Sequence, residues 1–178
     1  MAFALRTPRL LLRERRDSDA APFAAMSADP ALTEFLLPPD ENWVARVRQR
    51  WAEHGFGLFV VELPGEAPFI GVVGLNDLHH LAPAAPAIEA AWRLAPSFWG
   101  KGYALEAARA AIEDGFYRLG LDEIVAITVE SNQRSRRVME RLGMIRASQD
   151  DFDFEHPRLP EGHPLRPHVL YRMRRPAA

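Results

Sequence analysis

Residues 97–104, with the sequence SFWGKGYA, place two glycines between an expected strand and the start of an expected helix. Gly100 and Gly102 would allow positive φ angles there and a close approach of the backbone to a ligand. The free amide groups at the start of the helix, together with the helix dipole, favour a phosphate group. The segment therefore predicts a site for a pyrophosphate-bearing ligand. The alternative is a tight strand-to-helix turn without a ligand.

Two other phosphate-binding motifs fit these residues poorly. The dinucleotide fingerprint needs a third glycine, where this chain has Leu105, and an acid at the end of the next strand, whereas Asp122 and Glu123 precede that strand. The P-loop needs Ser or Thr after its Gly-Lys pair, but Gly102 follows here, and Ala95 replaces the first glycine. A dinucleotide-dependent oxidoreductase is therefore a disfavoured hypothesis, which titration with nucleotides would test.

The surrounding pattern predicts the elements that must position this turn. Alternating and apolar runs predict strands over residues 9–13, 56–63, 69–75, 88–94 and 124–129, near 145–154 and over 169–174. Helical spacing and caps predict helices over residues 20–26, 41–54, 103–119 and 132–142, with a loop marked by Pro83 and Pro86. The order of these elements predicts an α+β fold, with mixed α/β layers around one sheet.

Composition excludes several classes of protein. The chain has 178 residues, and we expect residues 1–178 to form a single domain. The near balance of 22 basic and 24 acidic residues disfavours nucleic acid as the primary partner. The basic helix with Arg134, Arg136, Arg137 and Arg141 is accordingly interpreted as a solvated face. No apolar run is long enough to span a membrane, and the absence of cysteine fits a cytoplasmic protein.

Several motifs resemble those of one enzyme superfamily. Residues 99–104 (WGKGYA), followed by Glu106 and Ala107, resemble the coenzyme A pyrophosphate loop of the GNAT acetyltransferases, whose pattern is Gln/Arg-x-x-Gly-x-Gly/Ala. Gly100 and Gly102 match this pattern, and Ser97 replaces the leading residue. Residues 129–144 are similar to the second family motif in its RimJ/RimL-like branch, with Met144 in place of phenylalanine, and residues 7–13 (TPRLLLR) are also similar to that branch. The resemblance spans roughly residues 6–146.

The resemblance implies both a fold and a reaction. A central twisted mixed sheet, flanked by helices, would be splayed at a V between two parallel strands, residues 88–94 and 123–130. The cosubstrate acetyl-CoA would lie in this V, and an amine would attack its thioester directly, without an acyl-enzyme. The residues that the resemblance assigns to coenzyme A binding are Trp92, Arg93, Leu94, Trp99, Gly100, Lys101, Gly102, Tyr103, Ala104, Asn132, Ser135 and Arg137.

This chemistry needs a base for the amine and an acid for the departing thiolate. Glu89 lies on the strand before the glycine turn, where burial would raise its pKa towards neutrality; the alternative is a glutamate that faces solvent. Ser135 is the candidate acid, in the first turn of the helix for which Asn132 is the expected N-cap; the alternative is a capping or surface serine. Tyr103 and Tyr117 are further candidates for the acid, although packing would explain Tyr117 better.

The acceptor is predicted only by class, as the amine of a small molecule or peptide. Alternation along residues 150–157 would gather Asp151, Asp153 and Glu155 on one face, as a wall that attracts cationic acceptors or as an edge strand protected by charge. No metal site is expected from His79 and His80, or from His156, His163 and His168. The protein would be a monomer or a homodimer. The rival hypothesis is a non-catalytic acyl-CoA-binding module, which would need neither Glu89 nor Ser135.

Overall fold

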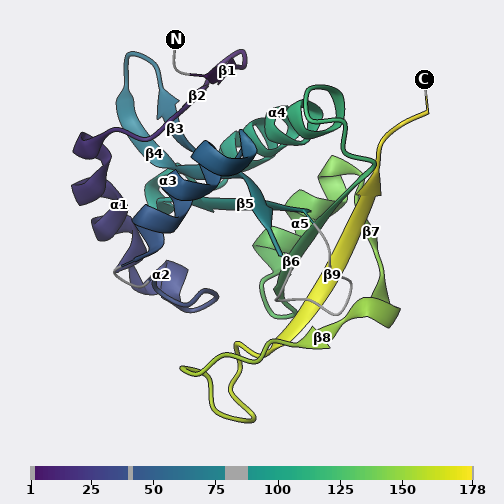
Figure 1. The fold of residues 1–178 in the computed structure, drawn as a ribbon. Helices are drawn as coiled ribbons and strands as arrows, with labels where there is room; N and C mark the ends of the chain where they lie inside the picture. Colours follow the sequence, from purple (N-terminus) through teal and green to yellow (C-terminus); the bar gives the residue numbers. More distant parts are fainter. Residues whose placement is uncertain (1–2, 40–41, 79–87, 178) are drawn as a thin grey trace.

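A mixed sheet forms the centre of the molecule (Figure 1). The computed structural model describes residues 3–39, 42–78 and 88–177, and within these ranges nine strands join in the order β1-β2-β3-β4-β5-β6-β9-β7, with β8 paired to β9. The strands are β1 (Ala4–Arg6), β2 (Leu11–Arg13), β3 (Leu58–Leu63), β4 (Ala67–Asp77), β5 (Ile88–Leu94), β6 (Glu123–Val129), β7 (Ile145–Arg146), β8 (Phe152–Asp153) and β9 (Pro167–Arg174). The helices are α1 (Ala20–Ser27), α2 (Pro30–Thr33), α3 (Trp43–His54), α4 (Tyr103–Tyr117) and α5 (Gln133–Leu142).

The strand pairing changes from antiparallel to parallel between β5 and β6. These two strands are parallel, joined through α4, whereas the other described strand pairs are antiparallel. A single rung links them, with Glu89 opposite Val125, and beyond it their carboxyl ends diverge (Figure 1). The expected fold class, a mixed sheet splayed between two parallel strands and flanked by helices, is confirmed.

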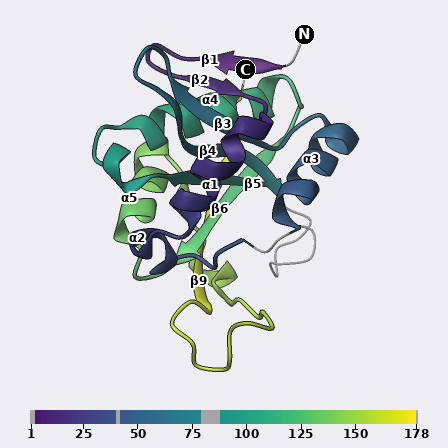
Figure 2. The same cartoon turned by 90° about the vertical axis from the view of Figure 1, so that its left-hand side faces the viewer.

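Helices cover both faces of the sheet, as Figure 2 shows from the side of α1. On the back face, α4 and α5 bury small and apolar side chains against the central strands, among them Ala108, Phe116 and Met139. On the front face, Phe23 of α1 and Leu32 of α2 pack against Val60 and Val72, which are rung partners on β3 and β4. The alternation of side chains along each strand thus separates the two apolar layers.

The described elements differ from the expected ones in several places, of which the following matter most. The strand expected near residues 145–154 is interrupted: Ser148–Asp150 forms a 3-10 turn between β7 and β8. The Oδ1 atom of Asp151 then accepts a hydrogen bond from the Leu170 amide, which replaces a rung of the ladder. The long helix α4 ends at Tyr117 instead of Leu119, and β1 and α2 were not expected. The predicted loop with Pro83 and Pro86, and the histidines at 79 and 80, lie outside the described residues.

A buried ion pair connects β2 to the turn before α1. The Arg13 guanidinium donates to both carboxylate oxygens of Asp19 at 2.8 and 2.9 Å, and its Nε donates to Glu62 at 2.8 Å. Arg13 and Asp19 are only 5% and 3% exposed. Burial alone would raise the pKa of Asp19, but hydrogen bonds from Arg13 and from the Arg16 amide outweigh it and hold that pKa below its ordinary value.

Replacing Asp19 by Ala is expected to lower the free energy of unfolding by about 3–5 kcal/mol at pH 7, because a buried guanidinium loses its main partner. Asp17→Ala is the matched control: Asp17 pairs with Arg48 at the surface and is 92% exposed, so its loss should cost no more than about 1 kcal/mol. A carboxylate with a depressed pKa stabilises the fold above its unfolded pKa, near ~3.9, and this contribution disappears as the pH falls. Denaturant titrations should therefore show the gap between wild type and Asp19→Ala narrowing towards pH 3. A constant gap would contradict this account.

Candidate active site

The glycine turn, residues 99–102, lies between β5 and α4. Gly100 and Gly102 have φ angles of +74° and +81°, in the left-handed region that favours glycine. Gly102 is the N-cap residue of α4 and offers no side chain to the amides of the first helical turn. A Cβ atom at Gly100 would meet nothing within 4 Å. The turn therefore presents uncapped amides beside open space, which is the geometry that an anionic group requires.

Trp99 connects this turn to both sides of the splay. Its Nε1 donates to the Leu94 carbonyl at 2.7 Å, and the Arg134 guanidinium lies 4.0 Å from the centre of its ring. Arg134 belongs to the first turn of α5, which follows β6 as the glycine turn follows β5. The two segments that leave the diverging strands thus meet across the opening of the V. Sequence reasoning interpreted Arg134 only as part of a solvated face.

Asn132 and Ser135 lie at the start of α5. Asn132 is the N-cap residue, as predicted: its Oδ1 accepts from the Ser135 amide at 3.2 Å, and its Nδ2 donates to Thr128 at 3.1 Å. The partly buried Ser135 hydroxyl makes no hydrogen bond to any residue that the structure describes. The Asn132 side chain is therefore committed to the helix cap, whereas the Ser135 hydroxyl can still donate to a ligand.

Glu89 occupies the rung at which β5 and β6 still pair. Its neighbour across the β4–β5 ladder is Asn76, whose Nδ2 donates to Glu89 Oε2 at 3.3 Å, and Arg50 of α3 donates in turn to Asn76 Oδ1. Burial raises the pKa of Glu89 to about 7, against the opposing effects of the Asn76 hydrogen bond and the positive charges of Arg93 and Arg50. A carboxyl group that titrates near neutrality can both accept and release protons in working conditions.

Residues 92–94 do not share one environment. Trp92 and Leu94 turn towards the back-face core, and the Leu94 side chain is buried there. Arg93 is the rung partner of Val72 and thus lies on the front face, together with Glu89. It lines a small cavity with residues of α1, α2 and the following segment: Ser27, Leu32, Thr33, Leu36, Leu37, Pro38 and Pro39. A ligand between β5 and β6 would therefore meet backbone groups of residues 92–94 before their side chains.

The remaining predicted residues divide between turn and surface. Lys101 is exposed, with its ammonium group 5.4 Å from the centre of the Phe98 ring, and the Tyr103 ring lies 4.6 Å from the Arg9 guanidinium carbon. Ala104 is part of the first turn of α4, and Arg137 lies exposed on α5. The packing explanation for Tyr117 is wrong, because this residue is 72% exposed at the last turn of α4.

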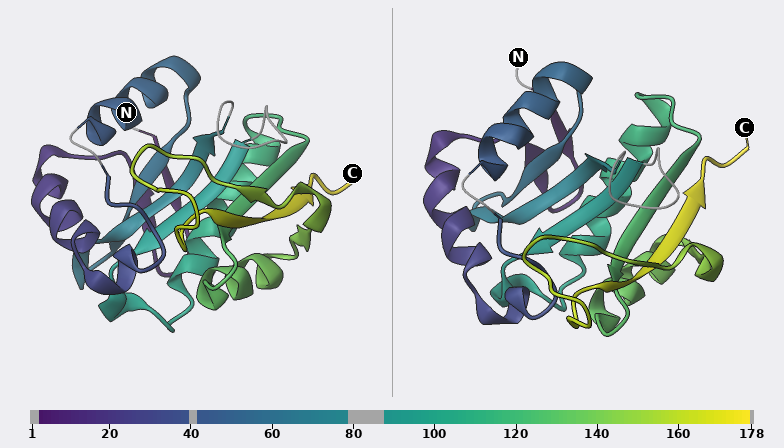
Figure 3. Two further views of the ribbon diagram at one scale, coloured as in Figure 1. Left: turned by 90° about the horizontal axis from the view of Figure 1, so that it is seen from below. Right: turned by 60° about the horizontal axis from the view of Figure 1, so that its bottom comes forward.

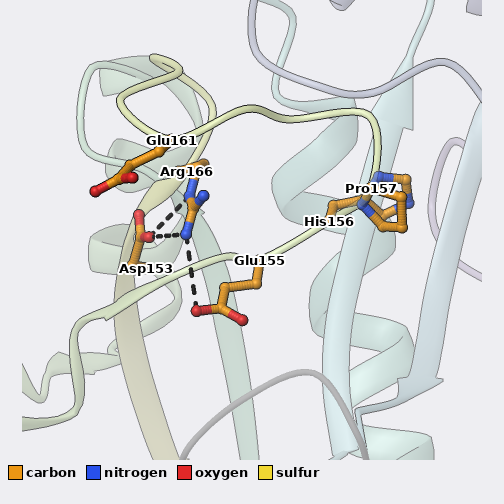
Figure 4. A pocket seen from close by; sticks show the side chains of 6 residues that line it. All are labelled: Asp153, Glu155, His156, Pro157, Glu161 and Arg166. Atoms are coloured by element: carbon orange, nitrogen blue, oxygen red, sulfur yellow. Dashed lines mark hydrogen bonds and ion pairs between the residues drawn. The ribbon is translucent and has the colours of Figure 1, made fainter.

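The predicted acidic face is divided by the interrupted strand. Asp151 pairs with Arg146 at 2.7 Å, whereas Asp153 and Glu155 turn towards Arg166 (Figure 4). Asp153, Glu155 and Arg166 line an open cavity of about 830 Å³ together with His156, Pro157 and Glu161. Three carboxylates and one guanidinium leave this cavity with a net negative charge.

The loop that carries this cavity reaches across the molecule. Residues 154–166 connect β8 to β9, and Figure 3 shows the loop passing from β9 towards the segment after α2. The Arg158 guanidinium donates to the Pro38 carbonyl at 2.9 Å, which fixes that approach. Because β9 is antiparallel to β6, the loop lies at the end of the sheet where β5 and β6 diverge.

Sequence reasoning missed the residues around Glu89. Asn76 belongs to the end of β4, one residue beyond the strand expected there, and alternation along a longer strand paired with residues 88–94 would have placed it beside Glu89. Arg50 could not be found in this way, because its contact with Asn76 depends on how α3 packs. Within the described ranges, no group of three or more His, Asp or Glu side chains is arranged to hold a metal ion, and no helix is long and apolar enough to cross a membrane.

Comparisons with known proteins agree with this geometry. The family model described as an acetyltransferase (GNAT) domain matches residues 9–145. A Bacillus subtilis protein named YkkB, described as uncharacterized, is 28% identical over 144 residues, which cover 78% of this chain and 83% of that protein. Spermidine N(1)-acetyltransferase of Escherichia coli is 33% identical over 86 residues, covering 48% of this chain and 43% of the enzyme. The crystal structure of an acetyltransferase from Agrobacterium tumefaciens superposes with a TM-score of 0.75 at 28% identity, covering 98% of this chain and 96% of the other.

Proposed function

We propose that this chain, which belongs to the GNAT family of acetyltransferases, transfers an acetyl group from acetyl-CoA directly to a primary amine of a small molecule, peptide or protein. One observation carries the proposal. Glu89, a carboxyl group with a pKa of about 7, lies at the rung from which β5 and β6 diverge. The glycine turn, whose conformation suits a phosphate group, lies at the open end between the two strands. In this proposal the base lies near the start of β5, and the anion site follows the end of the same strand.

The residues present fit the cosubstrate of this family. The amides of the glycine turn and of the first turn of α4 suit the pyrophosphate group. Beyond Glu89, the β6-facing edge of β5 forms no further rung in the described sheet. Its backbone groups therefore remain available to the amides of an extended pantetheine arm. Coenzyme A in this orientation would place its acetyl thioester towards the vertex of the splay.

In the proposed reaction, the neutral amine attacks the thioester carbonyl carbon. The new C–N bond forms, the C–S bond breaks, and the sulfur departs as a thiolate. Glu89 takes the proton that the amine loses, directly or through water, which its raised pKa permits near pH 7. Ser135 donates a hydrogen bond from its hydroxyl to the thiolate, assisted by the dipole at the start of α5, and the thiolate afterwards takes its proton from water.

Two finer features belong to the same proposal. A cationic acceptor is favoured by the net negative cavity of Asp153, Glu155 and Glu161 at the open end of the splay, and by the partial match to a spermidine acetyltransferase. The motifs at residues 7–13 and 129–144 support membership of the RimJ/RimL-like branch. A single domain over residues 1–178 is supported by β9, near the end of the chain, which pairs with β6 in the same sheet.

A screen of acceptors with acetyl-CoA tests the function. Free thiol should appear only when a primary amine is present, and spermidine should react faster than an uncharged amine of similar size. The rate advantage of the cation should shrink at high salt, because screening weakens long-range attraction. If coenzyme A raises the melting temperature but no amine releases thiol, the protein is the non-catalytic binding module instead.

A further inference from the structure

The turn between β1 and β2 is hydrogen-bonded to the first turn of α4. Glu106 Oε1 accepts hydrogen bonds from the Thr7 hydroxyl at 2.6 Å and from the Arg9 amide at 3.0 Å. Glu106 Oε2 accepts from Arg9 Nε at 2.7 Å and pairs with Nη2 at 2.6 Å. Burial alone would raise the pKa of Glu106, but the hydrogen bonds from Thr7 and Arg9 outweigh it and hold that pKa below its ordinary value.

The same guanidinium also holds the glycine turn. Arg9 Nη1 donates to the Lys101 carbonyl at 3.0 Å, and the guanidinium carbon lies 4.6 Å from the centre of the Tyr103 ring. Nη2 lies 3.4 Å from the point where a Cβ atom on Gly102 would be. Arg9 thus contacts both residues that flank Gly102, the N-cap residue of α4.

We propose that Thr7, Arg9 and Glu106 form a tether that positions the glycine turn for the pyrophosphate of coenzyme A. The inference rests on the proposed function. Arg9 and Glu106 are positioning residues: by fixing the Lys101 carbonyl, they keep the adjacent amides turned towards the anion.

The tether also neutralises a negative charge beside the proposed anion site. A carboxylate in the first turn of a helix is stabilised by the helix dipole, but it would repel a phosphate bound at the same helix end. The guanidinium of Arg9 neutralises Glu106 and, being 46% exposed, adds a cation beside the turn. A planar guanidinium can bridge the carboxylate and the carbonyl at once, whereas an ammonium group has no such fork.

The chain contains a matched control at the other end of α4. Arg118 forms the same kinds of contact as Arg9. It donates to both oxygens of Asp114 at 2.6 Å and to the Gly55 carbonyl at 3.2 Å, and it lies 4.2 Å from the centre of the Phe3 ring. Arg118→Gln therefore removes a comparable set of contacts far along the helix from the glycine turn.

The test compares two acetyl donors, acetyl-CoA and S-acetylpantetheine, which lacks the pyrophosphate. Arg9→Gln and Arg9→Lys should both raise the KM for acetyl-CoA by about 10- to 100-fold, the effect of losing a charged hydrogen-bond system. Their kcat, their KM for the amine and their kcat/KM with S-acetylpantetheine should stay at wild-type values. Arg118→Gln should leave all of these constants unchanged.

Two results would overturn the tether. One is an unchanged KM for acetyl-CoA in Arg9→Gln. The other is an equal loss with S-acetylpantetheine, which would show general damage to the fold. Calorimetric titration with coenzyme A and with pantetheine makes the same comparison without turnover, so the tether can be judged even if no amine reacts with the wild type. Absence of turnover in the wild type would count against the proposed function alone.

Discussion

Glu89→Gln is expected to lower kcat by about 100- to 10,000-fold, the usual scale of lost general-base assistance. The pH profile should change in the same variant. In the wild type, kcat should rise with pH through about 7 and then level off, because Glu89 must be ionised to accept a proton. This limb should vanish in Glu89→Gln, while the KM for acetyl-CoA stays close to that of the wild type. Steady-state rates between pH 5.5 and 9 would measure both effects.

A second measurement tests the raised pKa without any substrate. A carboxyl group whose pKa is higher in the folded state, about 7, than in the unfolded chain, about 4.3, binds more protons when folded. Its contribution to stability therefore falls as the pH rises between these values, so Glu89→Gln should gain stability relative to the wild type above pH 7. Ser135→Ala is the control for the pH profile of kcat. Serine does not titrate here, so the rise of kcat through about pH 7 should persist in this variant. A wild-type pH profile in Glu89→Gln would remove Glu89 from the mechanism.

Gly100→Val should abolish the rise in melting temperature that coenzyme A causes. The added side chain would occupy the open space beside the amides of the turn, so we expect affinity to fall by at least about 100-fold through the loss of several charge-assisted hydrogen bonds. Gly120→Val is a close control: Gly120 has φ +72° against +74° for Gly100, and a Cβ atom at either position meets nothing within 4 Å. Gly120 lies beyond the opposite end of α4.

Both glycine variants should lose about 1–2 kcal/mol of stability, because a β-branched residue is strained in the left-handed region. Only Gly100→Val should lose the response to coenzyme A. Thermal melts with and without the ligand, supported by calorimetric titration, would separate the two effects. Equal responses in both variants would mean that the glycine turn is a tight connection without a ligand.

Local signals in the sequence predicted most of what positions the site. The two glycines, the apolar run before α5 and the cap at Asn132 each depend on neighbours a few residues away, and the expected turn, strand and cap are confirmed. The hydrogen bond between Arg9 and Glu106 joins residues 97 apart in the sequence, and the local pattern around one residue does not indicate the other. The interruption after β7 also escaped the alternation pattern, because the Asp151 carboxylate satisfies a backbone amide of β9. Tertiary contacts of this kind override local periodicity.

The splay between β5 and β6 also has a consequence for how the chain folds. β1 to β5 form one side of the sheet and pair in the order of the sequence: β1–β2 and β3–β4 are hairpins over short loops, which close quickly, whereas α1, α2 and α3 lie between β2 and β3. The strands from β6 onward form the other side, and a single rung joins the two. Such a sheet is expected to open as two cooperative units, with the weakest boundary along the splay. A cosubstrate held by both strands would then restore the missing connection, so that binding and the joining of the two units become one event.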